Sequence, residues 1–290
     1  GGVNLYLHPS NYIGLSAQQM LSEDGQCKSF GLGGNGFVPG EGVGVVLLKP
    51  LQAAERDQDV IHGVIRASHV NHGSKTNGYT VPNPKAQAAL VRHTLDKAGI
   101  NARDISYMEA HGTGTELGDP IEISGLTQAY SQDTQARGFC KIGSAKSNIG
   151  HLEAAAGIAG LSKILLQMKH GQIVPSLHAK TLNPNIAFEQ TPFTVNQVVT
   201  AWQRPEIEGR QVPRLAGISS FGAGGGNSHV IVEEYVAGEA KLNSTQVMAM
   251  DETLIIPLSA RTKAQLEQRA RDLLQFIDVP SADFNSADLN

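Results

Sequence analysis

Cysteine is scarce in this sequence: Cys27 and Cys140 are the only two among 290 residues, and no CxxC spacing occurs. A disulfide framework and a cysteine-rich zinc module are therefore excluded. No apolar run reaches the roughly 18 residues that a membrane span needs, and no secretory signal opens the chain. We therefore expect a cytoplasmic protein without membrane contact.

An excess of charge of one sign is also lacking. The sequence has 23 lysines and arginines against 27 aspartates and glutamates, a formal net charge of −4, and no basic block. Nucleic-acid binding driven by bulk charge is therefore not expected. The 40% of hydrophobic residues, with 32 glycines and 13 prolines, indicates a globular protein with many tight turns.

Apolar, β-branched segments alternate with segments of helical periodicity. Strands are predicted at 2–7, 40–49, 60–69, 105–110 and 139–143, and helices at 84–98, 119–130 and 151–169. Residues 172–213 hold five prolines and are predicted to be irregular, and 214–221 with 228–235 form a predicted hairpin. Strands that alternate with helices indicate an α/β layered fold.

The composition changes after Tyr235. The small, polar stretch that follows is predicted to be a linker, and it leads to a predicted strand at 254–256. Residues 262–277 are predicted to form an amphipathic helix with a capping box of Thr262 and Gln265. This piece is too small to bury its own apolar face. The chain starts at Gly1 without a methionine, directly before a predicted strand, and ends at Asn290 without a stop-like feature, so we expect both ends to be cut from a longer protein.

Two histidines follow glycine-containing turns and are the first candidates for chemistry. His111 ends a predicted strand, and His151 stands at the predicted start of the long helix. The positive end of that helix would keep the His151 imidazole neutral, so that it could donate a hydrogen bond to a developing enolate or thioester oxygen. The alternative is a pair of core histidines satisfied by backbone groups.

Four further residues near these histidines are candidates. Lys146 and Glu153 flank His151 and could tune or orient it, or they could form an ordinary solvated ion pair. Thr113 and Thr115 could hold a polar ligand arm, or they could serve only the turn.

Two other patterns carry no site. Gly31, Gly33 and Gly36 match G-x-G-x-x-G, but a strand-like segment follows where a nucleotide site needs a helix. His69 and His72 are the nearest histidine pair, and a lone pair is weak evidence for metal binding. We therefore predict no metal site.

Three segments in fixed order carry a resemblance to a known family. EAHGTGTELGDP, KSNIGHLEAAAGIAG and SSFGAGGGNSHVIVEE resemble the C-terminal signatures of the β-ketoacyl synthase (ketosynthase) domains of modular polyketide synthases. GGVNLYLHPS and GEGVGVVLLK fit the same family, so the resemblance runs from residue 1 to about 236. The tail LIIPLSARTKAQLEQRARDLLQFI resembles the linker domain that follows such ketosynthases in bacterial assembly lines without integrated acyltransferases.

The resemblance implies a thiolase-like αβαβα layered fold of two similar halves. Residues 1–50 would be the end of the first half and 51–236 the second half. Residues 237–252 would be a linker, and 253–290 the start of an α/β linker domain. Such domains are homodimers that work with an acyl carrier protein and with the other domains of the synthase.

The implied reaction is a decarboxylative Claisen condensation on phosphopantetheine thioesters, with no cofactor bound by the domain itself. His111 and His151 would be the two catalytic histidines, and Lys146 would hold the electrostatics of the site together with Glu153. Thr113 and Thr115 would contact the pantetheine arm. Phe221 would line the pocket, with its N–H in an oxyanion hole.

The family's nucleophilic cysteine stands in a T-A-C-S-S-like turn that this sequence does not contain. Cys27 and Cys140 match other positions of the family and are predicted to be buried thiols. We therefore expect the chain alone not to condense substrates. Three interpretations follow: a fragment of a condensing ketosynthase, a natural half-domain that pairs with another chain, or a non-catalytic dimer or carrier-protein scaffold. The presence of both histidines favours the first.

Overall fold

The computed structural model describes residues 1–74, 76, 78, 81–207, 210–237 and 258–278. It forms two compact units, Gly1–Val236 and Ala237–Asn290. The expected strand at 254–256 and almost all of the expected linker lie outside the described residues. Within the described part, no helix is long and apolar enough to cross a membrane.

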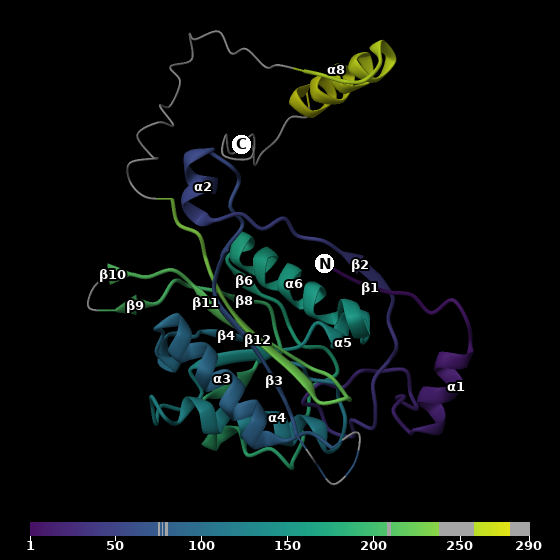
Figure 1. Cartoon of the computed structure of the whole chain (residues 1–290), viewed down its shortest axis with the longest axis vertical. Coiled ribbons are helices and arrows are strands. Elements are labelled where there is room, and N and C mark those ends of the chain that lie inside the picture. The colour runs from purple at the N-terminus through teal and green to yellow at the C-terminus, as the bar shows by residue number, and fades with distance from the viewer. Residues whose placement is uncertain (75, 77, 79–80, 208–209, 238–257, 279–290) are drawn as a thin grey trace. The chain divides into compact units, whose positions relative to one another are not determined.

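The first unit is built around a six-stranded mixed sheet, which crosses the centre of Figure 1. The strand order is β3 (Val64–His72), β12 (Gly226–Glu233), β11 (Leu215–Phe221), β4 (Tyr107–Glu109), β5 (Cys140–Gly143) and β7 (Phe193–Val195). The first three strands are antiparallel, and β11, β4, β5 and β7 are parallel. The predicted hairpin is confirmed as β11 and β12, with Leu215 opposite Glu233.

Helices cover both faces of this sheet. Helices α3 (Pro84–Ala98) and α4 (Gly118–Tyr130) lie together on one face, and α6 (Ala156–His170) lies on the other (Figure 1). Successive residues of β4 serve the two faces, because Met108 belongs to the core under α3 and α4 while Tyr107 belongs to the core under α6. Each fully buried aliphatic side chain in these cores contributes roughly 1.5–3 kcal/mol.

Helix α3 agrees with the sequence signals at both ends. Pro84 occupies its first turn, and the Asn83 side chain accepts hydrogen bonds from the N–H groups of Lys85 and Ala86. Gly99 ends it in the left-handed conformation, with φ of 65°. These are the start and stop signals that proline, asparagine and glycine give to a helix.

A second, smaller ribbon lies against α6. Strand β1 (Gly2–Asn4) pairs with β2 (Gly42–Gly44), and both are shorter than predicted. A Cβ at Gly44 would stand 2.7 Å from the Ile158 side chain of α6, so the ribbon and the helix touch closely. Many apolar side chains around the ribbon are exposed, namely Val3, Leu5, Leu7, Val43, Val45, Leu47 and Leu48.

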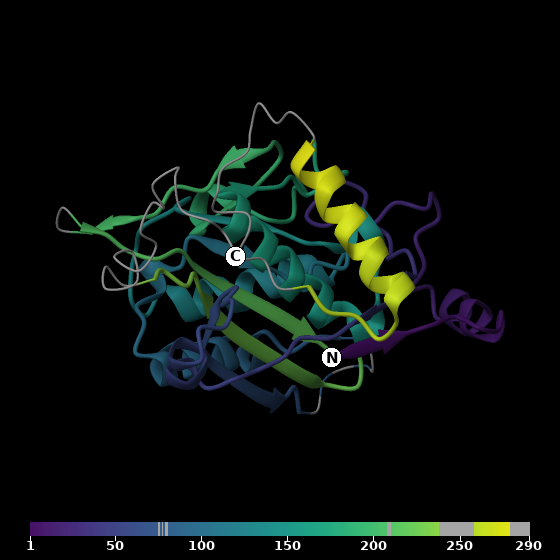
Figure 2. The ribbon, with the colours of Figure 1, turned by 90° about the horizontal axis from the view of Figure 1, so that it is seen from above.

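Helix α1 (Ser10–Ala17) was not predicted. It carries no buried residue and stands away from the sheet in both views (Figures 1 and 2). Without a buried stripe, its eight residues lack the periodic signal that identifies a helix. The remaining short helices are α2 (Leu51–Arg56), α5 (Lys146–Ile149), η1 (Ala102–Asp104), η2 (Glu153–Ala155) and η3 (Phe188–Gln190).

The prediction that the long helix starts at 151 is wrong, because α6 begins at Ala156. His151 forms a bridge with Pro39 instead, and its N–H donates to the Val38 carbonyl at 2.7 Å. The alanines and glycines that follow favour a helix, but these long-range backbone bonds hold residue 151 outside it.

The proline-rich segment from 172 to 213 is largely irregular, as predicted. Contrary to that prediction, it contributes strand β7 to the central sheet. It also contains two small antiparallel pairs, β6 (Gln172–Ile173) with β8 (Thr200–Ala201) and β9 (Glu206–Ile207) with β10 (Arg210–Gln211). Arg204 donates two hydrogen bonds to the Glu234 carboxylate, at 2.9 and 3.0 Å, and this ties the segment to the end of β12.

In the second unit, α8 (Lys263–Asp278) is close to the predicted helix over 262–277. The Gln265 N–H donates to the Thr262 hydroxyl at 3.3 Å, which is the N-terminal half of the predicted capping box.

Candidate active site

His111 sits in the turn that leaves the C-terminal end of β4, and two carboxylates from the first turns of α4 hold this turn. Glu122 accepts the N–H groups of His111 and Gly112, each at 2.8 Å. Asp119 accepts the Gly114 N–H at 3.1 Å and the Phe30 N–H at 2.7 Å. The turn therefore has a fixed shape, because its amides are bonded to buried carboxylates.

Glycine is required at two positions of this turn. Gly112 has φ of +44°, and a Cβ there would lie 2.9 Å from the Ser144 Cβ. Gly114 has φ of +72°, and a Cβ there would lie 2.8 Å from the Lys28 nitrogen. Both the backbone conformation and the close packing exclude a side chain.

His151 is held by backbone bonds on both sides. Besides the bond of its N–H to Val38, its carbonyl accepts the Gly40 N–H at 3.0 Å. Gly150 before it has φ of +78°, and a Cβ there would lie 2.7 Å from the Val38 carbonyl oxygen. The Phe37 ring packs on the imidazole with 4.8 Å between centroids.

The two imidazoles meet edge to face, with ring centroids 5.4 Å apart and planes at 81°. The Nδ1 atom of His111 accepts the Phe221 N–H at 3.3 Å, and the Nδ1 atom of His151 accepts the Glu153 N–H at 2.9 Å. A neutral imidazole has one donor and one acceptor nitrogen, so Nε2 of each ring carries the proton. Each ring thus keeps its Nε2–H group as a donor.

The bond from Phe221 changes one expectation. The family resemblance implies that the Phe221 N–H lies in an oxyanion hole, but in this structure it donates to the His111 ring. The Phe221 ring lies beside the same imidazole, with 5.6 Å between centroids. Phe221 therefore positions His111 and lines the site.

Both histidines are neutral at physiological pH. Burial, followed by the Lys146 ammonium group and His151, holds the pKa of His111 well below its usual value. Burial and the same ammonium group lower the pKa of His151 to about 3. The expected neutrality of His151 therefore has a different origin from the one predicted, because no helix begins at this residue.

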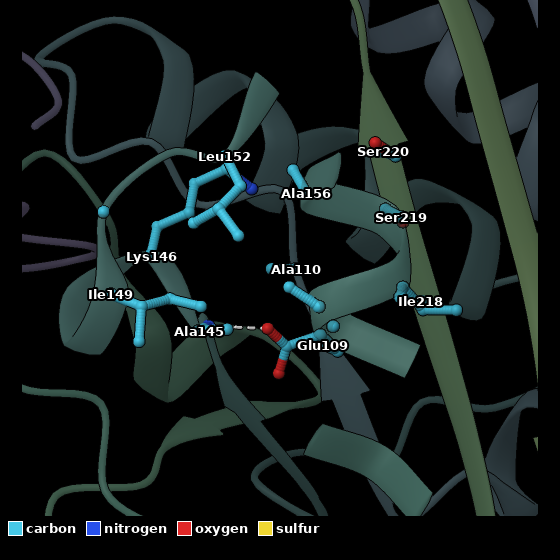
Figure 3. A pocket seen from close by; sticks show the side chains of 13 residues that line it. Glu109, Ala110, Ala145, Lys146, Ile149, Leu152, Ala156, Ile218, Ser219 and Ser220 are labelled. Atoms are coloured by element: carbon cyan, nitrogen blue, oxygen red, sulfur yellow. Dashed lines mark hydrogen bonds between the residues drawn. The ribbon is translucent and has the colours of Figure 1, made fainter. Parts of the chain in front are cut away.

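Lys146 is buried, and its charge acts on both histidines. Burial lowers its pKa, whereas the neighbouring carboxylates of Glu109, Glu122 and Asp119 raise it. Figure 3 shows Lys146 and Glu109 around a small cavity, where the Glu109 carboxylate accepts the Ala145 N–H at 2.6 Å. This cavity measures about 10 Å³, which is room for about one water molecule.

Glu153 does not share this environment. Its carboxylate is exposed and accepts a hydrogen bond from the Tyr6 hydroxyl, and its contact with His151 runs through its backbone N–H. The carboxylates that balance Lys146 are those of Glu109, Glu122 and Asp119. The expected electrostatic pairing of Lys146 with Glu153 is thus replaced by these three groups.

A cavity of about 1070 Å³ opens in front of the histidines. Of the seven candidates from the sequence, five line it, namely His111, Thr113, Thr115, His151 and Phe221. The hydroxyls of Thr113 and Thr115 lie 3.1 Å apart, and Thr115 also accepts the Gly118 N–H at 3.1 Å. The two threonines therefore serve the turn and also face the cavity.

Sequence reasoning missed the three buried carboxylates Glu109, Asp119 and Glu122. A signal for two of them was present, since Asp119 and Glu122 are three residues apart and thus share one face of a helix. Glu109 bonds to groups far along the chain and forms an ion pair with Lys163 at 2.8 Å, for which the sequence holds no comparable signal.

The thiols are confirmed as buried. Cys27 lies under the turn, with its sulfur 3.3 Å from the Thr113 carbonyl oxygen, and burial raises its pKa to about 11. Burial also raises the pKa of Cys140. Within the described residues, no three histidine, cysteine or acidic side chains gather in a way that could hold a metal ion.

Comparison with known families covers most of the chain in three consecutive parts. Residues 1–54 match the N-terminal domain of beta-ketoacyl synthase, and residues 62–180 match its C-terminal domain. Residues 183–284 match the ketoacyl-synthetase C-terminal extension.

Individual relatives include polyketide synthases and solved ketosynthase structures. Polyketide synthase PksM of Bacillus subtilis (strain 168) is 57% identical over 96% of this chain, which spans 6% of that protein. Polyketide synthase ThaG of Burkholderia thailandensis is 55% identical over 94% of the chain, which spans 5% of that protein.

Two solved structures have the same fold. The oxazolomycin ketosynthase domain OzmH KS7 of Streptomyces albus JA3453 aligns with a TM-score of 0.87 and 45% identity, covering 96% of this chain and 47% of that one. The ketosynthase from module 6 of the bacillaene synthase from Bacillus subtilis 168 aligns with a TM-score of 0.83 and 42% identity, covering 98% and 47%. The chain therefore spans about half the length of these ketosynthases, and its α/β fold is thiolase-like. It belongs to the β-ketoacyl synthase family and is similar to the ketosynthase domains of polyketide synthases.

Proposed function

We propose that this chain carries the histidine side of a condensing site in a polyketide synthase. The reaction is the decarboxylative Claisen condensation of an acyl-enzyme with a malonyl-type extender held on an acyl carrier protein. The observation that carries the proposal is the pair of neutral imidazoles, His111 and His151, whose Nδ1 atoms are occupied and whose Nε2–H groups remain as donors at one cavity.

The two Nε2–H groups would bind the thioester carbonyl oxygen of the extender. When the bond between the carboxylate and the α-carbon breaks, carbon dioxide leaves. The electron pair of that bond stays with the α-carbon and forms an enolate, whose negative charge rests on the thioester oxygen. Two fixed donors stabilise this charge more than they stabilise the neutral thioester, so they lower the barrier to decarboxylation. The α-carbon then attacks the acyl thioester, the new carbon–carbon bond forms, and the cysteine thiolate departs.

The acyl-carrying cysteine of this scheme lies outside the 290 residues. Neither thiol of the chain suits the role, since Cys27 and Cys140 are both buried and have raised pKa values. A nucleophilic cysteine needs access and a thiolate at working pH. For this reason the chain alone would not complete the reaction.

Lys146 would act together with burial to keep both histidines in the donor form. Burial lowers the pKa of each imidazole, the positive charge of Lys146 lowers it further, and the carboxylates around Lys146 balance that charge within the core. A protonated imidazole would instead offer a mobile proton, which could quench the enolate before it attacks the acyl group.

The wider assignments are part of the same proposal. Thr113 and Thr115 would contact the phosphopantetheine arm, and the carrier protein, a second copy of the domain and other domains of the synthase would be the partners. A cytoplasmic assembly line without integrated acyltransferases fits the resemblance of the tail. The domain would bind no cofactor of its own.

The test separates acylation from decarboxylation in the complete ketosynthase domain that contains these residues. We expect His151→Ala and His111→Ala to retain loading of the cysteine, as measured by mass spectrometry. Both should lower carbon dioxide release from malonyl-carrier protein about 100-fold or more. His93→Ala, which alters an exposed histidine of α3, is the control and should match the wild type. Extension of a malonyl unit at the normal rate by His151→Ala would refute the proposal.

A further inference from the structure

Glu153 has a backbone conformation that its residue type disfavours. Its φ is +41°, in the left-handed region where a Cβ causes steric strain. In this conformation its N–H donates to the Nδ1 atom of His151 at 2.9 Å. A conformation strained in this way persists only where neighbouring contacts impose it.

The contact that holds Glu153 comes from the segment after β1. The Tyr6 hydroxyl donates a hydrogen bond to the Glu153 carboxylate across 147 positions of the chain. Burial and the Glu153 carboxylate together raise the pKa of Tyr6, so this hydroxyl keeps its proton and remains a donor throughout the neutral range.

Tyr6 is itself fixed at two points. Its N–H donates to the Glu41 carboxylate at 2.6 Å, and its ring packs on Tyr12 with 5.0 Å between centroids. The hydroxyl is therefore presented from an anchored backbone. A partner held in this way can impose a conformation on Glu153, whereas a freely rotating side chain could not.

We propose that Tyr6 is a positioning residue for His151, acting through Glu153. The Tyr6 hydroxyl holds the carboxylate, the carboxylate holds residue 153 in its left-handed conformation, and residue 153 directs its N–H at Nδ1. This N–H fixes the tautomer in which Nε2 is the donor. The inference rests on the proposed function, because it assigns Tyr6 to the histidine that decarboxylation uses.

The first test is Tyr6→Phe in the complete ketosynthase domain, with malonyl-carrier protein as the substrate. The variant keeps the ring and removes the hydroxyl. We expect kcat for carbon dioxide release to fall about three- to tenfold, as for the loss of one hydrogen bond, with KM changed less than about twofold. Tyr12→Phe removes the hydroxyl of the adjacent exposed ring and should retain the wild-type kcat.

A rescue experiment distinguishes positioning from general damage. Glycine adopts a φ of +41° without steric cost, so Tyr6→Phe with Glu153→Gly should direct the N–H at His151 without the tether and recover most of the lost kcat. Tyr6→Phe with Glu153→Ala keeps the Cβ and should not recover. Thermal unfolding of each variant checks that the domain is folded.

The outcomes are separable from those for the proposed function. A wild-type kcat in Tyr6→Phe would overturn the inference while leaving the histidine assignment intact. The same holds if the double variant with Glu153→Gly is folded but recovers no more kcat than the double variant with Glu153→Ala. If His151→Ala releases carbon dioxide at the normal rate, the proposed function fails first, whatever the result at Tyr6.

Discussion

The imidazoles of His111 and His151 meet edge to face, with ring centroids 5.4 Å apart. The Nδ1 atom of each ring accepts a backbone N–H, and the two N–H groups come from different parts of the chain. His111 takes its N–H from the end of β11, and His151 takes its own from the η2 turn. The two donors of the site are thus oriented by backbone, whose position depends on the fold. Changes that shift this backbone should affect the chemistry without touching either histidine.

Gly150→Ala should be strongly destabilising and should lower decarboxylation. The residue has φ of +78°, and an added Cβ would lie 2.7 Å from the Val38 carbonyl oxygen, so the backbone that holds His151 must move. We expect a loss of about 2–4 kcal/mol in the free energy of unfolding, measured by chemical denaturation of the complete domain.

Gly99→Ala is the matched control for this substitution. Gly99 also has a positive φ, +65°, but a Cβ there meets nothing within 4 Å. We expect a loss of about 1 kcal/mol with unchanged activity, since only the backbone cost at the end of α3 is involved. Equal losses at positions 150 and 99 would show that the packing around Gly150 has no part in the effect.

Glu122→Gln should change the pH dependence of stability. Burial raises the pKa of Glu122 from an ordinary value of 4.5 to about 7. The folded protein therefore keeps a proton that the unfolded chain releases, and the contribution of this group to stability falls as pH rises from about 5 to about 8. The variant lacks this titration.

The quantity to measure is the difference in unfolding free energy between Glu122→Gln and the wild type, at pH 5 and at pH 8. As the pH rises from 5 to 8, we expect the unfolding free energy of the variant to increase by on the order of 2–3 kcal/mol relative to that of the wild type. A difference that is constant with pH would contradict the raised pKa. A part of the difference that does not change with pH reflects the amide itself. The amide has one acceptor oxygen, whereas the carboxylate has two, which accept the N–H groups of His111 and Gly112.

Neither cysteine should react in the folded protein. In the complete domain at pH 7.5, we expect iodoacetamide to leave Cys27 and Cys140 unmodified and to label both after denaturation, as read by peptide mass spectrometry. Cys27→Ala should retain loading of the acyl chain. Rapid labelling of Cys27, with loss of loading in Cys27→Ala, would reassign it as the acyl acceptor.

The 290-residue chain by itself should associate or bind a hydrophobic dye. Apolar side chains around the β1–β2 ribbon are exposed, with Val45 at 81% and Leu47 at 95% of their full area. Sedimentation velocity and dye fluorescence would measure this, and Val45→Lys with Leu47→Lys should reduce both signals. A monomer that binds no dye and unfolds in one sharp transition would contradict the expectation.

Local signals predicted the parts of the fold that depend on local chemistry. Pro84 and Gly99 mark the ends of α3 because each residue type fixes a backbone conformation. The glycines around His111 and His151 marked both turns for the same reason. The resemblance of the three motifs then indicated which histidines to pair, which no local pattern could do.

The remaining features depend on partners that are distant in sequence. His151 lies outside the long helix because its backbone bonds to Val38 and Gly40, more than 100 residues earlier. Glu109 was not predicted as a site residue for a similar reason. The Tyr107 hydroxyl donates to it from the same strand, but Ala145 and Lys163 contact it only across the fold. Periodicity and capping rules carry no information about such pairs.

The glycines in the turns that carry His111 and His151 limit how this member of the family can be altered by protein engineering. At Gly112, Gly114 and Gly150, any side chain would meet neighbouring atoms within 3 Å, so a mutant library spread evenly over the site would lose most of its members there. One wall of the cavity has side chains that are exposed or only half-buried, such as Glu116 and Met20. Selection for new substrates should therefore concentrate diversity at that wall and leave the inner turns as they are.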